Sequence, residues 1–174
     1  ADGAVRLVLQ GVDIHRNDGP AIHVKDADSL VIVLAEGTQN TLGDGATYAA
    51  ATGTDTPDAA VFSEDDITIE GTGKLTVKGV HNNGIATSDD LVIAGGTLVV
   101  EAVDDALLGR DSVTVKAGTL VLKAGGDGIR TTNDTDAAKG GIVIVAGSIA
   151  ITAGADTIDA ASALLVTGGT VKIV

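Results

Sequence analysis

The chain has 174 residues, of which 44% are hydrophobic but only 1% aromatic, and it has no cysteine and a formal net charge of −13. This length fits one domain, and the lack of cysteine excludes disulfides and thiolate metal sites. The negative charge argues against nucleic acid and against anionic membranes, which both require a basic face, and favours cations or anionic partners bridged by cations.

Short strand-like segments begin at the N-terminus. Residues 5–9 read as a strand, a polar corner follows at 13–18, and residues 30–32 form an alternating run after the Asp18-Gly19 turn. Residues 43–58 then interrupt the pattern with a polar, glycine-containing stretch. We expect this stretch to be a long excursion from the body of the protein.

A repeat of about 22 residues runs from there to the end of the chain, as the spacing of Leu107 and Ile129 illustrates. Each copy has an isolated aliphatic residue, an alternating run, a glycine turn and a second alternating run. A second excursion interrupts the repeat near residues 132–138. The alternation predicts strands with one buried face, and a period in the low twenties is typical of a solenoid.

The predicted fold is therefore all-β: a single right-handed parallel β-helix over residues 1–174, with three short strands per coil. The last alternating run continues to Val174, and neither end of the chain has a recognisable cap. Solenoid ends normally need caps, so we expect either a trimmed chain or open ends that stack on another subunit.

One corner of the repeat has an acidic or amide side chain on five coils: Asp58, Asn83, Asp105, Asp127 and Asp156. Carboxylates stacked at the inter-strand spacing repel unless they are solvated, protonated or bridged by a cation. The second excursion carries further acids and can fold back over this corner. Oxygen ligands of this kind suit Ca²⁺.

We predict a calcium site at this corner. Its candidate ligands are Asp105, Asp127 and Asp134 first, then Asp104, Asp136 and Asp156. The alternative is a solvated corner whose side chains cap backbone N–H groups in turns.

A second acidic column precedes the first alternating run of three coils and consists of Asp65-Asp66, Asp89-Asp90 and Asp111-Ser112. Here turn capping is the favoured interpretation, with a secondary cation site as the alternative.

Three basic residues, Arg110, Arg130 and Lys139, lie near the acidic corner in the repeat frame. A lyase would need one of them as a base, but neighbouring carboxylates favour the cationic form and raise the pKa. Salt bridging or contact with an acidic ligand is the expected role. About half of the outward strand positions are apolar, which indicates an interaction surface.

Residues 5–12, 18–22, 126–129 and 132–140 resemble the motifs of secreted bacterial carbohydrate-binding domain-containing proteins. The resemblance implies a pectate-lyase-like right-handed β-helix, an extracellular location, bound calcium and affinity for plant cell-wall polysaccharides, including acidic ones. It places calcium-associated Asp-Gly corners at Asp105, Asp127 and Asp134. The chain departs from the family where Ala106 follows Asp105 and Thr157 follows Asp156.

Three functions follow from these observations. The first is a non-catalytic extracellular module in which calcium bridges the protein to an acidic, uronate-type polysaccharide. The second is a structural subunit that assembles end to end, through open ends and apolar faces, into extracellular fibres. The third is a calcium-dependent polysaccharide lyase.

Overall fold

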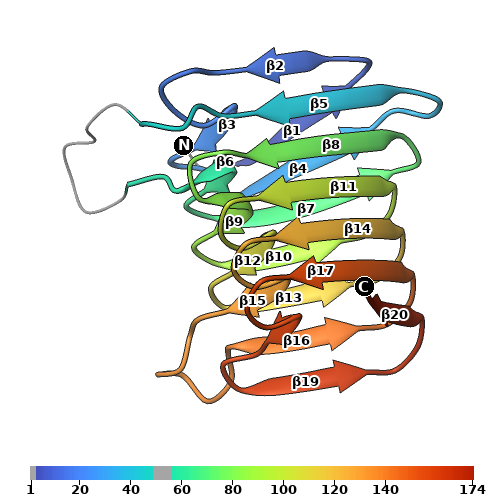
Figure 1. Cartoon of the computed structure of the whole chain (residues 1–174). Coiled ribbons are helices and arrows are strands. Elements are labelled where there is room, and N and C mark those ends of the chain that lie inside the picture. Colours follow the sequence, from blue (N-terminus) through green and yellow to red (C-terminus); the bar gives the residue numbers. More distant parts are fainter. Residues whose placement is uncertain (1–2, 49–55) are drawn as a thin grey trace.

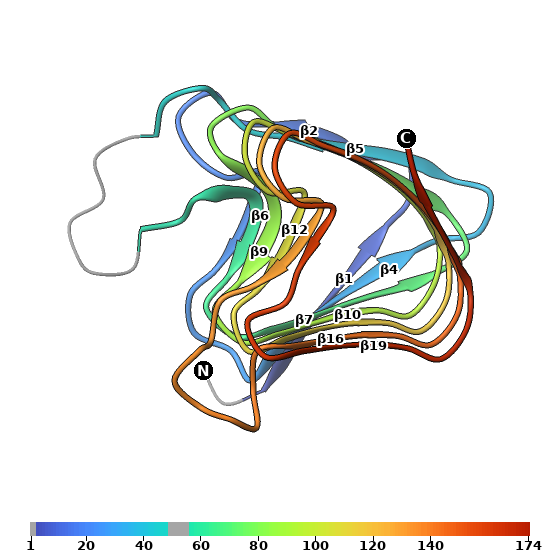
Figure 2. The same cartoon turned by 60° about the horizontal axis from the view of Figure 1, so that its bottom comes forward.

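The computed structural model describes residues 3–48 and 56–174, which form twenty strands joined by turns and loops. The strands make three parallel sheets, and the chain visits the sheets in turn, so that each coil adds one strand to each sheet (Figures 1 and 2). This arrangement confirms the predicted parallel β-helix. The described residues contain no helix long and apolar enough to cross a membrane.

Two of the sheets have seven strands and the third has six. Sheet A consists of β1 (Ala4–Leu9), β4 (Ser29–Leu34), β7 (Asp66–Gly71), β10 (Asp90–Ile93), β13 (Ser112–Val115), β16 (Gly141–Ile144) and β19 (Ala163–Val166). Sheet B consists of β2 (Asp13–His15), β5 (Gln39–Gly43), β8 (Lys74–Gly79), β11 (Thr97–Ala102), β14 (Thr119–Ala124), β17 (Ser148–Ala153) and β20 (Thr170–Ile173). Sheet C consists of β3 (Ile22–Val24), β6 (Ala59–Ser63), β9 (Asn83–Thr87), β12 (Leu107–Gly109), β15 (Ile129–Thr131) and β18 (Ile158–Asp159).

Both predicted excursions connect sheet strands. The first joins β5, which ends at Gly43, to β6, which begins at Ala59, and part of it lies outside the described residues. The second joins β15 to β16 through residues 132–140 and is called the insert below. The strands keep their register across the insert, because Val113 of β13 pairs with Ile142 of β16.

The core is a set of aliphatic ladders that run along the solenoid. In sheet A one such ladder is fully buried and consists of Leu30, Ile67, Leu91, Val113 and Ile142. The alternate positions point outward, and Val92 lies between Thr68 and Thr114 in the predicted register. Alternation with a period of two therefore sets which face of each strand is buried.

Glycines stack at the corner between sheets A and B, directly before five strands of sheet B, and four of them have a positive φ. Gly118 and Gly147 there have φ values of 111° and 107°. A Cβ atom on Gly118 would lie 2.9 Å from the carbonyl oxygen of Gly96 on the neighbouring coil. Both the backbone conformation and the close stacking of coils therefore require glycine at this corner.

We expect Gly118→Ala to lower the free energy of unfolding by about 1–3 kcal/mol, because the new methyl group strains φ and meets the neighbouring backbone. Urea denaturation measures this change. Gly141→Ala is the matched control, since its φ is not positive and its added Cβ would be 3.8 Å from the nearest atoms. The control should be unchanged or up to about 1 kcal/mol more stable. Equal losses in both variants would contradict the stacking argument.

Candidate functional site

The acidic corner predicted from the repeat lies where the chain enters sheet C, and its side chains bind backbone amides of the next coil. Asn83 Oδ1 accepts a hydrogen bond from the Asp105 N–H at 3.0 Å, and Asp105 Oδ1 accepts one from the Asp127 N–H at 2.8 Å. Asp127 Oδ1 accepts one from the Asp156 N–H at 2.7 Å. This amide ladder is the capping arrangement that the sequence left as the alternative to calcium.

Arg130 supplies the positive charge at this corner. Its Nη1 lies 3.3 Å from Asp105 Oδ2, and its Nε lies 3.6 Å from Asp127 Oδ2 and 3.5 Å from Asp159 Oδ2. The Asp105 residue is only 2% exposed, and this burial raises the pKa of its carboxyl. Burial acts to lower the pKa of Arg130, but the charges of Asp105, Asp127 and Asp159 and the hydrogen bond to Asp105 together outweigh it and raise that pKa. A buried carboxylate needs such a partner.

The corner as built does not fit the predicted calcium site. Each carboxylate of Asp105 and Asp127 gives one oxygen to a backbone N–H and the other to Arg130, whose guanidinium lies where a bridging ion would have to bind. Asp134 is exposed in the insert, and the insert is anchored elsewhere. Within the described residues, no group of three or more His, Cys, Asp or Glu side chains is placed to hold a metal ion.

The remaining predicted ligands are scattered. Asp156 is exposed, Asp104 is partly buried, and Asp136 caps the Ala138 N–H at 2.9 Å within the insert. Asp58 was expected to share the corner, but Ala59 is the residue that pairs with Asn83, so Asp58 lies one position earlier. The extra residue between Asp58 and Val61, compared with the other coils, produces this offset.

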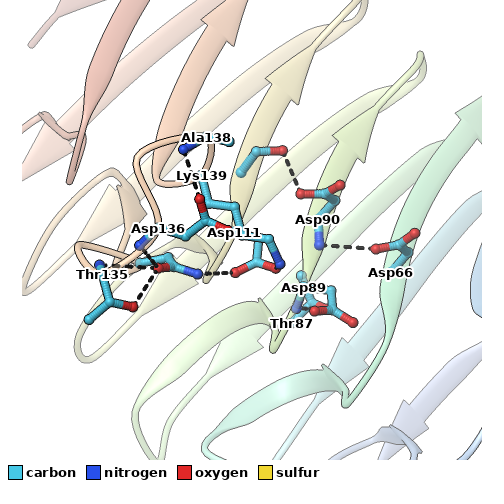
Figure 3. A network of polar contacts seen from close by, with 11 residues as sticks. Asp66, Thr87, Asp89, Asp90, Asp111, Thr135, Asp136, Ala138 and Lys139 are labelled. Carbon is cyan, nitrogen blue, oxygen red and sulfur yellow. Dashed lines mark hydrogen bonds and ion pairs between the residues drawn. The ribbon is translucent and has the colours of Figure 1, made fainter.

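The insert is tied to the second acidic column. Asn133 Nδ2 donates to Asp111 Oδ1 at 2.6 Å, and Lys139 Nζ donates to Asp111 Oδ2 (Figure 3). The Gly140 N–H donates to the Asp111 carbonyl oxygen. The Asn133 side-chain oxygen also accepts from Thr135 and Asp136, which orders the loop itself. The insert therefore covers Asp111 and leaves the acidic corner uncovered.

A cleft of about 480 Å³ lies between the insert and the first residues of sheet A strands. We call it the acidic cleft; its lining residues are Asp66, Asp89, Asp90, Asp111, Ser112, Ala138 and Lys139. Ser112 Oγ donates to Asp90 Oδ1 at 2.8 Å, and the Asp90 N–H donates to Asp66 Oδ1 at 3.1 Å (Figure 3). Several carboxylate oxygens thus face one solvent-filled space on consecutive coils.

The titratable groups of the acidic cleft have pKa values that are shifted in different directions. Burial, with the nearby charges of Asp111 and Asp66, raises the pKa of Asp89. Burial also acts to raise the pKa of Asp111, but hydrogen bonds from Lys139 and Asn133 outweigh it and lower that pKa. The hydrogen bond to Asp111 raises the pKa of Lys139. Lys139 is therefore held as a cation and is poorly suited to act as a base.

The structure separates the three basic residues that the sequence grouped. Arg130 lies at the acidic corner, Lys139 in the acidic cleft, and Arg110 in a third place on the outer face of sheet C. Sequence reasoning treated the second acidic column as turn chemistry and missed the cleft. One feature of the sequence could have indicated the cleft. The insert begins one coil after Asp111-Ser112, at a position from which a loop can cover the second acidic column.

Comparisons with known proteins agree with this fold. A family model described as carbohydrate-binding domain-containing protein matches residues 1–174. A carbohydrate-binding domain-containing protein of Acetivibrio thermocellus is 45% identical over 97 residues, which are 55% of this chain and 34% of that protein. The match thus spans about a third of the length of this curated relative. The solved polysaccharide lyase-like protein from C. thermocellum, a gadolinium derivative, has a TM-score of 0.86 and 38% identity, over 98% of this chain and 73% of that one.

The amide ladder predicts that Asp105→Asn keeps the acceptor for the Asp127 N–H, whereas Asp105→Ala leaves that amide without a partner. We expect Asp105→Ala to be less stable than Asp105→Asn by about 1–3 kcal/mol. The raised pKa of Asp105 means that the folded wild type binds this proton more tightly than the unfolded chain. Wild-type stability from this group therefore falls as pH rises above about 3.9.

The stability of Asp105→Asn relative to wild type should accordingly increase with pH, which denaturation at about pH 4 and about pH 8 measures. A difference that stays constant with pH, or decreases, would show that burial of the Asp105 charge is not costly.

The anchoring of the insert makes a separate prediction. Because Lys139 and Asn133 lower the pKa of Asp111, this group stabilises the fold above its unfolded pKa of about 3.9, and the stability is lost as pH falls through the lower folded value. Lys139→Met should raise the Asp111 pKa and move acid unfolding to higher pH. Carboxyl ¹³C NMR titration measures the pKa, and Lys116→Met, an exposed lysine on another corner, is the control. An unchanged Asp111 pKa would contradict the anchor.

Proposed function

The chain belongs to the family of carbohydrate-binding domain-containing proteins, and on that premise we propose that it is a non-catalytic extracellular module that binds polysaccharide in the acidic cleft. The observation that carries the proposal is the alignment of Asp66, Asp90 and Ser112 at the start of neighbouring sheet A strands. Such carboxylates accept strong hydrogen bonds from hydroxyl groups. Because coils repeat at about 4.8 Å, acceptors recur along the cleft as hydroxyls recur along a sugar chain.

We also propose that the polysaccharide is acidic, and binding of such a ligand in this cleft requires a cation. A uronate carboxylate entering the cleft meets Asp66, Asp89 and Asp90, and the chain as a whole has a net charge of −13. Ca²⁺ takes six to eight oxygen ligands, more than the described side chains bring to one point. We therefore propose that cleft carboxylates and sugar oxygens would together hold a calcium ion, and that neither would do so alone.

The non-catalytic part of the proposal is supported by the state of the basic groups. Lyase chemistry requires a base that is deprotonated near the working pH. Lys139, which lines the cleft, has its pKa raised by Asp111, and Arg130 has its pKa raised by Asp105. Incubation with polygalacturonate and calcium should therefore give no new unsaturated uronate ends. Formation of such ends at a rate dependent on Lys139 would sink the proposal.

The cleft is tested by Asp89→Asn and Asp90→Asn, which preserve shape but remove charge. We expect each to weaken calcium-loaded binding of polygalacturonate about tenfold, measured by titration calorimetry, because a charged hydrogen-bonding or metal-binding group is lost. Glu36→Gln, an exposed acid at another corner, should bind as wild type does. The effect of the two cleft variants should vanish after chelation of calcium. If the variants bind like wild type under both conditions, the cleft is not the binding site.

A further inference from the structure

A second groove lies on the outer face of sheet C, apart from the acidic cleft. It has a volume of about 220 Å³ and is lined by Thr56, Asp58, Phe62, Thr87, Ser88, Leu108, Arg110 and Thr132. Figure 2 shows that the chain enters β6 at one end of sheet C and that the insert leaves β15 at the other end. The groove is therefore bordered by both interruptions of the repeat. Its size suits one sugar ring better than a larger ligand.

The floor of the groove is apolar although it faces outward. Phe62, Ala86 and Leu108 are neighbours on consecutive strands of sheet C, and with Ala59 they form a hydrophobic cluster separate from the solenoid core. Phe62 is the only phenylalanine of the chain. The ring of His23 contacts its edge, with the centroids 5.6 Å apart. Phe62 is only 8% exposed and Leu108 is partly exposed, so the leucine and the part of the aromatic ring that reaches the groove offer an apolar contact for the C–H face of a pyranose.

Two polar groups border this floor and have capacity for a further partner. The Oδ1 atom of Asp58 is buried and has no hydrogen-bond partner, which is costly for a carboxylate oxygen. Burial raises the pKa of Asp58, while a side-chain hydrogen bond with Asn83 acts to lower it. The guanidinium of Arg110 is exposed and makes no hydrogen bond or ion pair within the described part of the chain. A hydroxyl donor would satisfy Asp58, and Arg110 is shaped to bind a carboxylate with two hydrogen bonds.

We propose that this groove is a second carbohydrate site that binds a single uronic acid residue without calcium. The sugar ring lies on Phe62 and Leu108, one of its hydroxyls donates to Asp58, and its carboxylate pairs with Arg110. The site rests on the carbohydrate-binding function proposed above but not on the acidic cleft. The charge of the two sites also differs. In this groove the carboxylate of the ligand contacts the cation Arg110 directly, whereas the acidic cleft is lined by carboxylates.

The test is titration calorimetry of the full chain with trigalacturonate in the presence of a chelator, with the neutral trisaccharide cellotriose as comparison. We expect wild type to bind trigalacturonate at least about tenfold more tightly than cellotriose, and Arg110→Gln to remove that preference. Lys116→Gln is the matched control, because Lys116 is also exposed and without an ion pair in the described structure. Thermal unfolding of each variant checks that the fold is retained.

Further variants separate this site from the cleft. Phe62→Leu should weaken binding of trigalacturonate, while Glu36→Gln, an exposed acid at another corner, should leave chelated binding unchanged. Absence of chelator-resistant binding by wild type, or equal affinity of wild type and Arg110→Gln, would overturn the second site without affecting the cleft. Conversely, loss at Arg110 combined with normal binding by the cleft variants would keep the groove and remove the cleft as a polysaccharide site.

Discussion

Each coil of this solenoid lies on the previous one in register, so every side chain has its equivalents on neighbouring coils about 4.8 Å away. For aliphatic residues this proximity is favourable, and it produces the buried ladder from Leu30 to Ile142. For aspartate the same proximity is costly, because like charges face one another across strands. With 24 acidic residues against 11 basic ones, the fold depends on how its repeated carboxylates are accommodated.

The molecule accommodates them differently at two corners. At the entrance to sheet C, Asp105 and Asp127 are buried, and each accepts a backbone N–H from the next coil while Arg130 balances their charge. At the entrance to sheet A, Asp66, Asp89 and Asp90 remain beside solvent, and Lys139 of the insert pairs with Asp111. At the first corner each buried carboxylate already has a backbone N–H and Arg130 as partners, whereas the second corner retains carboxylate oxygens beside solvent. This difference is why we place the proposed polysaccharide site at the second corner.

The repeat made the fold predictable, since the alternation around Val113 and Ile142 specifies strands, faces and register before any contact is known. The chemistry of the acidic corners was less predictable. Asp105 and Asp65 look alike in sequence, but one lies 2% exposed beside Arg130 and the other caps the Ala27 N–H at 3.0 Å from a partly exposed position. The path of the insert was also not predictable from spacing. Short-range spacing allowed it to cover either corner, and the hydrogen bonds of Asn133 and Lys139 to Asp111 fixed its path.

The insert also relates the two proposed sites, which differ in charge, to each other. It begins at Thr132, which lines the groove on sheet C, and ends near Lys139, which lines the acidic cleft. Arg110 and Asp111 are adjacent in sequence but lie on the two sides of this turn, one in the groove and the other beneath Lys139. Lys139 and Asn133 bind the Asp111 carboxylate, and within the described residues the Arg110 guanidinium makes no ion pair with it, although its charge contributes to lowering the Asp111 pKa. The insert thus binds one carboxylate while the exposed neighbouring cation lines the groove, which is how a chain of net charge −13 could hold the anionic sugar that we propose.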